Sequence, residues 1–208
     1  MIIDCISDLH GYCPKLDGGD LLIIAGDLTA RDRSSDWENF FLWLSKQEYK
    51  KKIFISGNHD NQAMSQFDWY DAEYLCDSGT EFEALNIWGS PWSLWFNGIN
   101  PKCTAFTGSE KDLKKKFDLI PDDIDILITH SPPYGILDKT IRNEHVGSKS
   151  LAYKIGMMEN PPRLWVWGHI HESYGVDFAV RGKHVKMINA SYVNERYEPV
   201  NKVIRIEL

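Results

Sequence analysis

The chain has 208 residues, of which 43% are hydrophobic and 25% are charged, and its formal net charge is -7. This length and composition exclude a disordered chain and suit one core, so we expect a single domain over residues 1–208. The acidic charge disfavours duplex DNA or RNA as a partner, because binding them requires clustered lysine and arginine, and we expect a small substrate instead.

Three short, isoleucine-rich apolar runs open the chain and predict buried strands. They cover residues 2–7, 21–25 and 53–56. Residues 34–51 predict an amphipathic helix, because four large apolar residues recur at helical spacing behind a capping Ser or Asp. These four residues are Trp37, Phe40, Phe41 and Leu44. A strand, helix, strand order predicts parallel strands whose carboxyl ends share one edge of a sheet, where ligands bind.

The rest of the chain predicts further strands and helices, with no repeat or linker. Residues 81–95 predict two short strands around Asn86, and they lead into the aromatic segment WGSPWSLWFN. Helices are expected at residues 109–118 and 147–158. Strands are expected at residues 124–129, 164–167 and 203–208, with a hairpin over residues 176–188.

The cysteines and the apolar runs bear on the cellular compartment. The four cysteines are widely spaced and form no C-x-x-C pair, which favours a reducing environment. The chain starts directly with a strand pattern, and no apolar run approaches the roughly 20 residues of a membrane span. We therefore expect a cytoplasmic protein that does not bind membranes.

Side chains that ligate metals follow five of the predicted strands. The candidate ligands are Asp8, His10, Asp27, Asn58, His130, His169 and His171. Because the carboxyl ends of the strands meet at one edge, we expect these side chains to converge. Carboxylate, amide and imidazole ligands together favour manganese, iron or zinc over magnesium or calcium. Seven candidates are too many for one metal with an open position, and they suit two metals that share a carboxylate.

Two divalent metals imply a reaction as well as a site. A pair about 3.5–4 Å apart can deprotonate a bridging water and clamp the oxygens of an in-line displacement at phosphorus. The sequence therefore predicts hydrolysis of a phosphate ester with two divalent metal ions, manganese first and iron or zinc as alternatives.

Five short motifs, in this order, resemble the calcineurin-like metallophosphoesterase superfamily. They are DLH at residues 8–10, GD at 26–27, GNHD at 57–60, TH at 129–130 and GHIH at 168–171. Longer matches resemble the branch of metallophosphoesterase domain-containing proteins, namely WGSPW, THSPPYGILD, GHIHESYG and NAS. The resemblance implies an α/β fold in which two mixed β-sheets pack as a sandwich flanked by helices, in four layers, α/β/β/α.

The resemblance also implies a role for each residue at the site. The first metal would be held by Asp8, His10 and His171, and the second by Asn58, His130 and His169, with Asp27 bridging them. His59 would be catalytic, contacting the phosphate and protonating the leaving group, and Asp60 would orient its ring. Two positions depart from the branch, Asp60 in place of glutamate and Ser131 in place of glycine, and neither removes a metal ligand.

Several functions are compatible with this centre. The leading expectation is a phosphodiesterase that acts on a small diester, with cyclic nucleotides and nucleotide-like compounds first. A phosphomonoesterase or phosphoprotein phosphatase would use the same centre, so both remain alternatives. A fold that has lost catalysis and serves as a nucleotide-binding or scaffold module is the alternative from another class, and such a protein should have eroded ligands.

Aromatic residues and one further histidine are secondary candidates for substrate contact. The aromatic candidates are Trp88, Trp92, Trp95 and Phe96, and core packing is favoured for each ring, with one of the group lining the pocket. His145 lies in the loop after THSPP, where a solvated loop histidine is the favoured interpretation.

Overall fold

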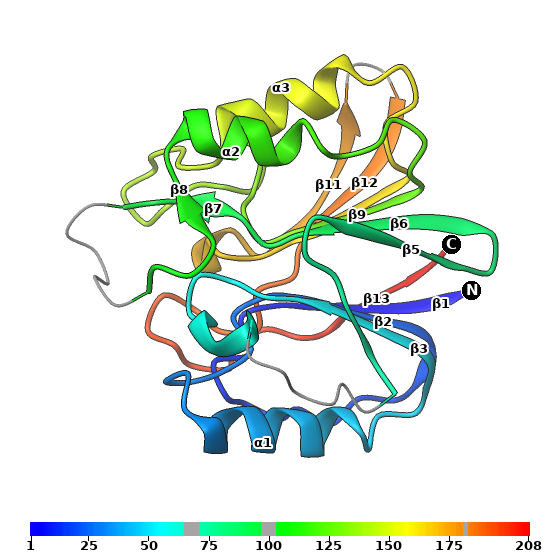
Figure 1. Ribbon diagram of the computed structural model, residues 1–208, viewed down its shortest axis with the longest axis vertical. Helices are drawn as coiled ribbons and strands as arrows, with labels where there is room; N and C mark the ends of the chain where they lie inside the picture. Colours follow the sequence, from blue (N-terminus) through cyan, green and yellow to red (C-terminus); the bar gives the residue numbers. More distant parts are fainter. Residues whose placement is uncertain (65–70, 97–102, 181–182) are drawn as a thin grey trace.

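The computed structural model describes residues 1–64, 71–96, 103–180 and 183–208 (Figure 1). Two mixed β-sheets face each other, and helices cover their outer faces. Helix α1 (Ser34–Leu44) covers one sheet, and helices α2 (Glu110–Phe117) and α3 (Lys149–Met157) cover the other (Figure 1). The four-layer α/β/β/α class expected from the resemblance is confirmed.

The first sheet contains the strands that open the chain. Its strands are β1 (Ile2–Ile6), β2 (Gly19–Ala25), β3 (Tyr49–Ile55), β4 (Glu73–Tyr74) and β13 (Ile204–Glu207). Their order in space is β13-β1-β2-β3-β4, and all are parallel except β13, which runs antiparallel to β1. The parallel strands read as continuous apolar runs because both faces of the sheet are covered.

The second sheet is built from the later strands. They are β5 (Ser78–Phe82), β6 (Leu85–Ser90), β9 (Ile126–Thr129), β10 (Leu164–Trp167), β11 (Gly175–Val180) and β12 (Lys183–Asn189). Their order is β11-β12-β10-β9-β6-β5, with four parallel inner strands and antiparallel edges. Strands β7 (Ser93–Leu94) and β8 (Thr107–Gly108) form a separate pair. Short 3-10 helices are η1 (Asn61–Met64) and η2 (His171–Ser173).

Three apolar clusters hold the layers together. The cluster between the sheets is aliphatic and includes Ile23 and Ile55 from the first sheet and Ile128 and Val166 from the second. The outer clusters are more aromatic, with Trp37 of α1 packed in one of them. Burying one such side chain contributes roughly 1.5–3 kcal/mol, so the sandwich is a rigid support for the strand ends.

The helix predicted over residues 34–51 is shorter than expected. It ends at Leu44, and the chain re-enters the first sheet at Tyr49, which pairs with Gly19 of β2. The buried ammonium of Lys52 lies 3.5 Å from the carbonyl of Leu44 and 3.4 Å from that of Gln47. The lysine-rich end of the segment is therefore strand, and Lys52 neutralises the carboxyl end of the helix.

The two strands predicted around Asn86 meet at a different turn. Asn86 lies inside β6, and the turn falls at Glu83 and Ala84, whose φ angles are 47° and 63°. Hairpin turns need these left-handed conformations, which asparagine and glycine adopt most easily. The choice of Asn86 as the turn was wrong because the actual turn uses residues without that preference.

None of the helices in the described part of the chain combines the length and apolar character that crossing a bilayer requires. All four cysteines are free thiols.

Candidate metal centre

The predicted ligands lie together at one edge of the sandwich, where parallel strands of both sheets end. Asp8 follows β1, Asp27 follows β2 and Asn58 follows β3. His130 follows β9 directly, and His169 follows β10. The convergence expected from the strand order is therefore present in the structure.

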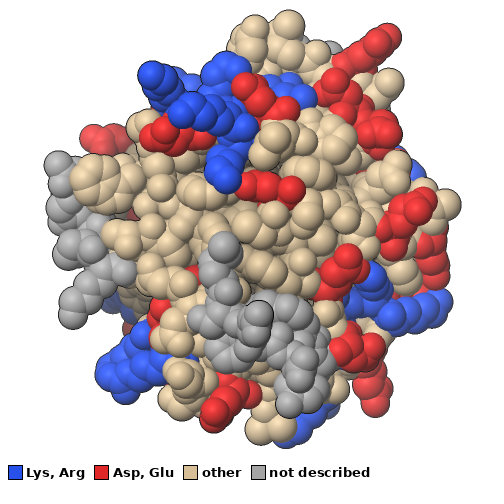
Figure 2. Space-filling model, viewed as in Figure 1, with Lys and Arg blue, Asp and Glu red and all other residues tan. Residues whose placement is uncertain are grey.

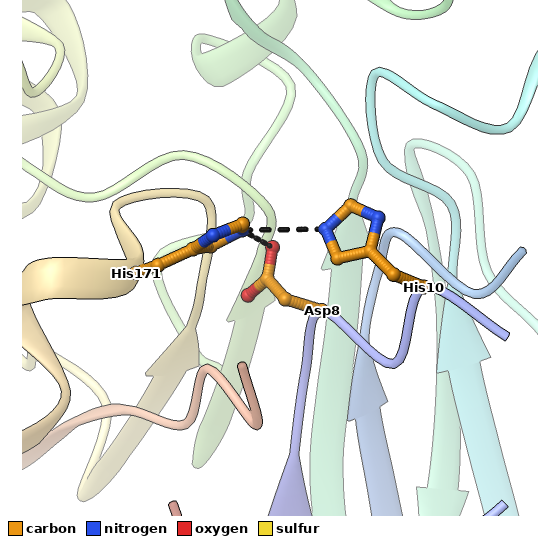
Figure 3. A group of neighbouring side chains, drawn as sticks. All are labelled: Asp8, His10 and His171. Carbon is orange, nitrogen blue, oxygen red and sulfur yellow. Dashed lines mark hydrogen bonds and ion pairs between the residues drawn. The ribbon is translucent and has the colours of Figure 1, made fainter. Parts of the chain in front are cut away.

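The first group consists of Asp8, His10 and His171, whose side chains point toward one another (Figure 3). The Nε2 atoms of His10 and His171 are 3.3 Å apart, and Nε2 of His171 lies 3.3 Å from Oδ1 of Asp8. Oδ2 of Asp27 approaches the same group, 3.7 Å from Nε2 of His10. Two segments far apart in the sequence, the loop after β1 and the start of η2, thus present three ligand atoms to one point.

The second group, Asn58, His130 and His169, lies on the other side of Asp27. Oδ1 of Asp27 is 3.4 Å from Nε2 of His130, and this nitrogen is 3.0 Å from Oδ1 of Asn58. The rings of His130 and His169 lie 4.9 Å apart. Asp27 therefore directs one oxygen toward each group, an arrangement that suits a carboxylate shared by two metals.

Backbone carbonyls fix the orientation of two of the imidazoles. Nδ1 of His130 donates to the carbonyl of Ala25 at 2.9 Å, and Nδ1 of His171 donates to the carbonyl of Asn194 at 3.1 Å. Each bond leaves Nε2 facing the cluster, which is the usual way that a protein sets the tautomer of a metal ligand. Asn194 was not among the sequence candidates, because a carbonyl contact has no residue-type signature.

The turns that carry the ligands are strained. Asp8, His10, Asp27 and His169 have φ angles of 52°, 43°, 52° and 70°, in the left-handed region. Non-glycine residues adopt this region rarely, and such residues cluster at functional sites. The strain supports the assignment of this edge as the functional one.

The glycines of the motifs make room for the ligands. A Cβ atom on Gly57 would lie 2.1 Å from Oδ1 of Asp27, and one on Gly168 would lie 2.0 Å from Oδ2 of Asp8. Any side chain there would displace a carboxylate. Close packing around the two aspartates therefore requires glycine at the first position of the GNHD and GHIH motifs.

Four of the candidate ligands, two aspartates and two histidines, have protonation states that suit metal binding. Burial raises the pKa of Asp8, but the hydrogen bond and charge of His171 outweigh it, so the pKa lies below its usual value. Burial also raises the pKa of Asp27, but the charge of His130 outweighs burial, so the pKa of Asp27 lies well below its usual value. Burial lowers the pKa of His10 to about 4 and that of His169 to about 3. The aspartates are thus ionised and these two imidazoles neutral, the forms that bind metal.

One buried nitrogen shows whether the side chains of the second group suit a metal ion. Nε2 of His169 is buried and has no hydrogen-bond partner among the described residues. An unsatisfied buried polar group costs about 1–3 kcal/mol, so this nitrogen needs a ligand. A metal ion at the second group would bind it. The donor set therefore fits two divalent metal ions.

His59 and Asp60 have different partners from those implied by the resemblance. The Asp60 carboxylate accepts backbone N–H bonds from Leu28 and Gly57, at 3.1 and 2.9 Å, and it thereby joins two loops of the site. In the described part of the chain, the ring of His59 contacts other groups: Nδ1 lies 3.4 Å from Sγ of Cys103, and Nε2 lies 3.9 Å from Oδ2 of Asp27. The Asp60 carboxylate thus accepts hydrogen bonds from loop amides, where the resemblance implied a contact with the ring of His59.

A cavity of about 410 Å³ opens over the centre. Asp27, His59 and His169 are part of its lining, and Trp95 and Phe96 line its wall. The other two aromatic candidates pack elsewhere. Trp92 donates to Asp77 at 2.9 Å, and Trp88 packs against the cluster under α2 and α3.

His145 is tied to the protein rather than directed at the centre. Its Nδ1 lies 2.5 Å from Oδ1 of the buried Asp138, and its ring is partly exposed. Its chain neighbours Glu144 and Val146 line the cavity, whereas His145 does not. The contact with Asp138 therefore holds this loop in place.

Comparisons with known proteins agree with the geometry. The sequence model of the calcineurin-like phosphoesterase family matches residues 1–173. Metallophosphoesterase domain-containing protein 1 of Homo sapiens and of Mus musculus is 34% identical to this chain, over 98% of this chain and 70% of the relative. The crystal structure of TT1561 from Thermus thermophilus has a TM-score of 0.60 at 17% identity, and the match covers 90% of this chain and 88% of that chain. This structural likeness concerns the fold.

Proposed function

The chain belongs to the calcineurin-like phosphoesterase family, and from this premise we propose that it is a phosphodiesterase that cleaves a small diester, nucleotide-like compounds first. Membership makes the chain a metal-dependent phosphoester hydrolase. The preference for diesters, the identity of the metal and the roles of single residues are the proposal. A cytoplasmic location stays a prediction.

The observation that carries the proposal is the position of Asp27 between two groups of ligands. Its oxygens lie 3.7 Å from His10 and 3.4 Å from His130. We assign one ion to Asp8, His10 and His171, a second to Asn58, His130 and His169, and Asp27 to both. When bound, the two ions supply the Lewis acidity that activates a water and stabilises charge at phosphorus. Imidazole and carboxylate donors favour manganese, with iron or zinc as alternatives.

The position of His59 supports its proposed role as a proton donor. Its backbone N–H donates to Oδ1 of Asp27 at 2.9 Å, which anchors it beside the centre, and its side chain lines the cavity. In this proposal His59 contacts the phosphate and protonates the leaving oxygen. General acid catalysis of this kind contributes typically 10²- to 10⁴-fold. Asp60 supports it by fixing the loop rather than the ring.

The charge of the cavity rim favours a diester over a monoester. Glu144, Glu172 and Glu195 line the cavity, and Arg142 is the one arginine or lysine among its described lining residues. An acidic rim repels a dianionic monoester more strongly than a singly charged diester, because the Coulomb energy scales with the charge.

The outer surface also favours a small substrate. Figure 2 shows acidic and basic side chains interspersed on this face, with a basic group over α2. The lysines of α2 have acidic neighbours, since Lys114 pairs with Asp118 at 2.6 Å and Lys116 with Asp77 at 3.2 Å. These lysines are thus partly neutralised and offer little to a phosphate backbone.

Hydrolysis of bis(p-nitrophenyl) phosphate with added Mn²⁺ tests the proposal against its alternatives. We expect turnover by the wild type and loss of turnover in Asp27→Ala, with a lower rate for p-nitrophenyl phosphate. Equal rates for wild type and Asp27→Ala would support the binding-module alternative instead. A faster monoester reaction would favour the phosphomonoesterase. Cyclic 2′,3′- and 3′,5′-nucleotides then serve as the second panel.

A further inference from the structure

Tyr197 lies beside the metal centre, in the loop between β12 and β13. Its ring packs edge-on against His10, at a centroid distance of 4.7 Å, and against His171, at 5.3 Å. It lies 6.2 Å from the ring of His59. The side chain lines the cavity, and the residue is 39% exposed. Tyr197 therefore forms a side wall of the first metal position, and it lies beyond the residues 1–173 that match the family.

The backbone of Tyr197 is held in an unusual conformation. Its φ angle is 61°, in the left-handed region that aromatic residues rarely adopt. Its N–H donates to the carbonyl of Asn194 at 2.9 Å, and the hydroxyl of Tyr12 donates to its carbonyl at 3.2 Å. The hydrogen bond to Asn194 closes a turn that holds the ring of Tyr197 against His10 and His171.

Other lining residues of the cavity are also apolar. The ring of Phe96 stacks on His169, with 5.9 Å between centroids and 23° between planes. Trp95 is 57% exposed and Ile141 is 73% exposed, and both line the cavity. A bare phosphate group gains nothing from such walls, whereas a flat apolar substituent buries area against them. These apolar walls favour a phosphate that carries an aromatic group.

We propose that Tyr197 is a specificity-determining residue that packs against the aromatic, non-leaving group of a phosphodiester, an inference that rests on the proposed function. In an in-line displacement the leaving oxygen lies opposite the attacking water, and here it faces His59. Tyr197 lies instead at the side, against His10 and His171. The group that remains on phosphorus is the one that reaches a side wall. An aryl ester or a nucleoside has the required chemistry.

Two diesters with the same leaving group isolate this contact. Bis(p-nitrophenyl) phosphate carries an aromatic non-leaving group, and methyl p-nitrophenyl phosphate carries a methyl group. For Tyr197→Leu we expect the KM of the first to rise roughly 3- to 10-fold, with the KM of the second unchanged. Tyr197→Phe keeps the ring and should match the wild type. Tyr153→Leu, on the exposed face of α3, is the control, because Tyr153 is 65% exposed.

The content of bound metal separates a local contact from a structural role. Both Tyr197 variants should retain the wild-type content of Mn²⁺. An equal rise in KM for the two diesters, or loss of metal from Tyr197→Leu, would overturn the proposal.

Failure of the wild type to hydrolyse either diester would refute the proposed function alone. Calorimetric binding of phenyl phosphate and methyl phosphate to the Mn²⁺-loaded protein then tests Tyr197. If Tyr197→Leu binds phenyl phosphate more weakly than the wild type does, and methyl phosphate equally well, the contact is supported. An equal loss of affinity for both ligands refutes it.

Discussion

The carbonyl of Asn194 accepts a hydrogen bond of 3.1 Å from Nδ1 of His171, and this bond connects the loop after β12 to the first group of ligands. The side chain of Asn194 shapes the same loop. Its Oδ1 accepts the N–H groups of Arg196 and Glu198, at 2.9 and 3.0 Å. One residue thus orients a metal ligand through its backbone and stabilises the turn that presents Tyr197 through its side chain.

Substituting Asn194 should weaken metal binding without removing a ligand. In Asn194→Ala the turn loses three side-chain hydrogen bonds, two accepted by Oδ1 and one donated by Nδ2 to Glu198, so the carbonyl no longer holds His171 in place. Outer-shell partners of this kind are typically worth 10- to 100-fold in metal affinity, and we expect a loss in this range at one of two sites. Titration with Mn²⁺ followed by calorimetry measures it. Val200→Ala, at a 59% exposed position of the same loop, is the control. Two sites of wild-type affinity in Asn194→Ala would contradict this role.

His169→Ala should bind one metal ion instead of two. The variant removes the buried Nε2 that has no partner among the described residues, and with it a ligand of the second position. Elemental analysis after dialysis gives the metal content directly. His184→Ala replaces an exposed histidine of β12 and should keep both ions. A metal content of two in His169→Ala would show that His169 is not a ligand.

His59→Ala should separate catalysis from metal binding. We expect both ions to remain and turnover to fall roughly 100- to 10,000-fold, most for esters with poor leaving groups, because these depend most on a proton donor. Rates for a series of esters with leaving groups of different pKa measure the effect. His59 also lies with His10 and Asp27 in a group able to hold a metal. Loss of an ion from His59→Ala would therefore identify it as a ligand.

The strand ends and their motifs were sufficient to predict which side chains converge. Asp8 and Asp27 follow apolar runs that the sequence identifies as buried strands, and parallel order brings them to one edge of the first sheet. Parallel order likewise brings His130 and His169 to one edge of the second sheet. The four-layer fold depended on the resemblance, because a strand pattern does not specify how two sheets pack. The single domain over residues 1–208 stays a prediction.

Contacts through the backbone and between distant loops could not be predicted in this way. Cys103 approaches His59, and Tyr197 approaches His10, from loops without a strand or a motif beside them. The Asp60 carboxylate has the residue type expected of a partner for His59, yet its geometry directs it to backbone amides. Residue type limits what a side chain is able to bind, and the path of the loop decides which partner it meets.

Glu110 should make stability depend on pH, away from the metal centre. Its carboxylate connects α2 to the first turn of α3, accepting the N–H of Lys149 at 2.6 Å and the hydroxyls of Ser150 and Ser148 at 2.7 and 3.1 Å. Partial burial raises its pKa, but these hydrogen bonds, that of Ser150 first, outweigh burial and lower the pKa below its usual value. The ionised form is therefore favoured by folding.

The sign of the effect follows from this lowered pKa. The stabilisation is fully present above the unfolded pKa of about 4.3, and it is lost as the pH falls through the lower folded value. Wild type should exceed Glu110→Gln by about 1–2 kcal/mol in free energy of unfolding at pH 7, because hydrogen bonds to a charged group are lost. Urea unfolding of both proteins between pH 7 and pH 3 should show this difference shrinking below about pH 4. Glu38→Gln, at an exposed position of α1, should show little difference at any pH. A difference for Glu110→Gln that stays constant down to pH 3 would mean that the charge of Glu110 is not its source.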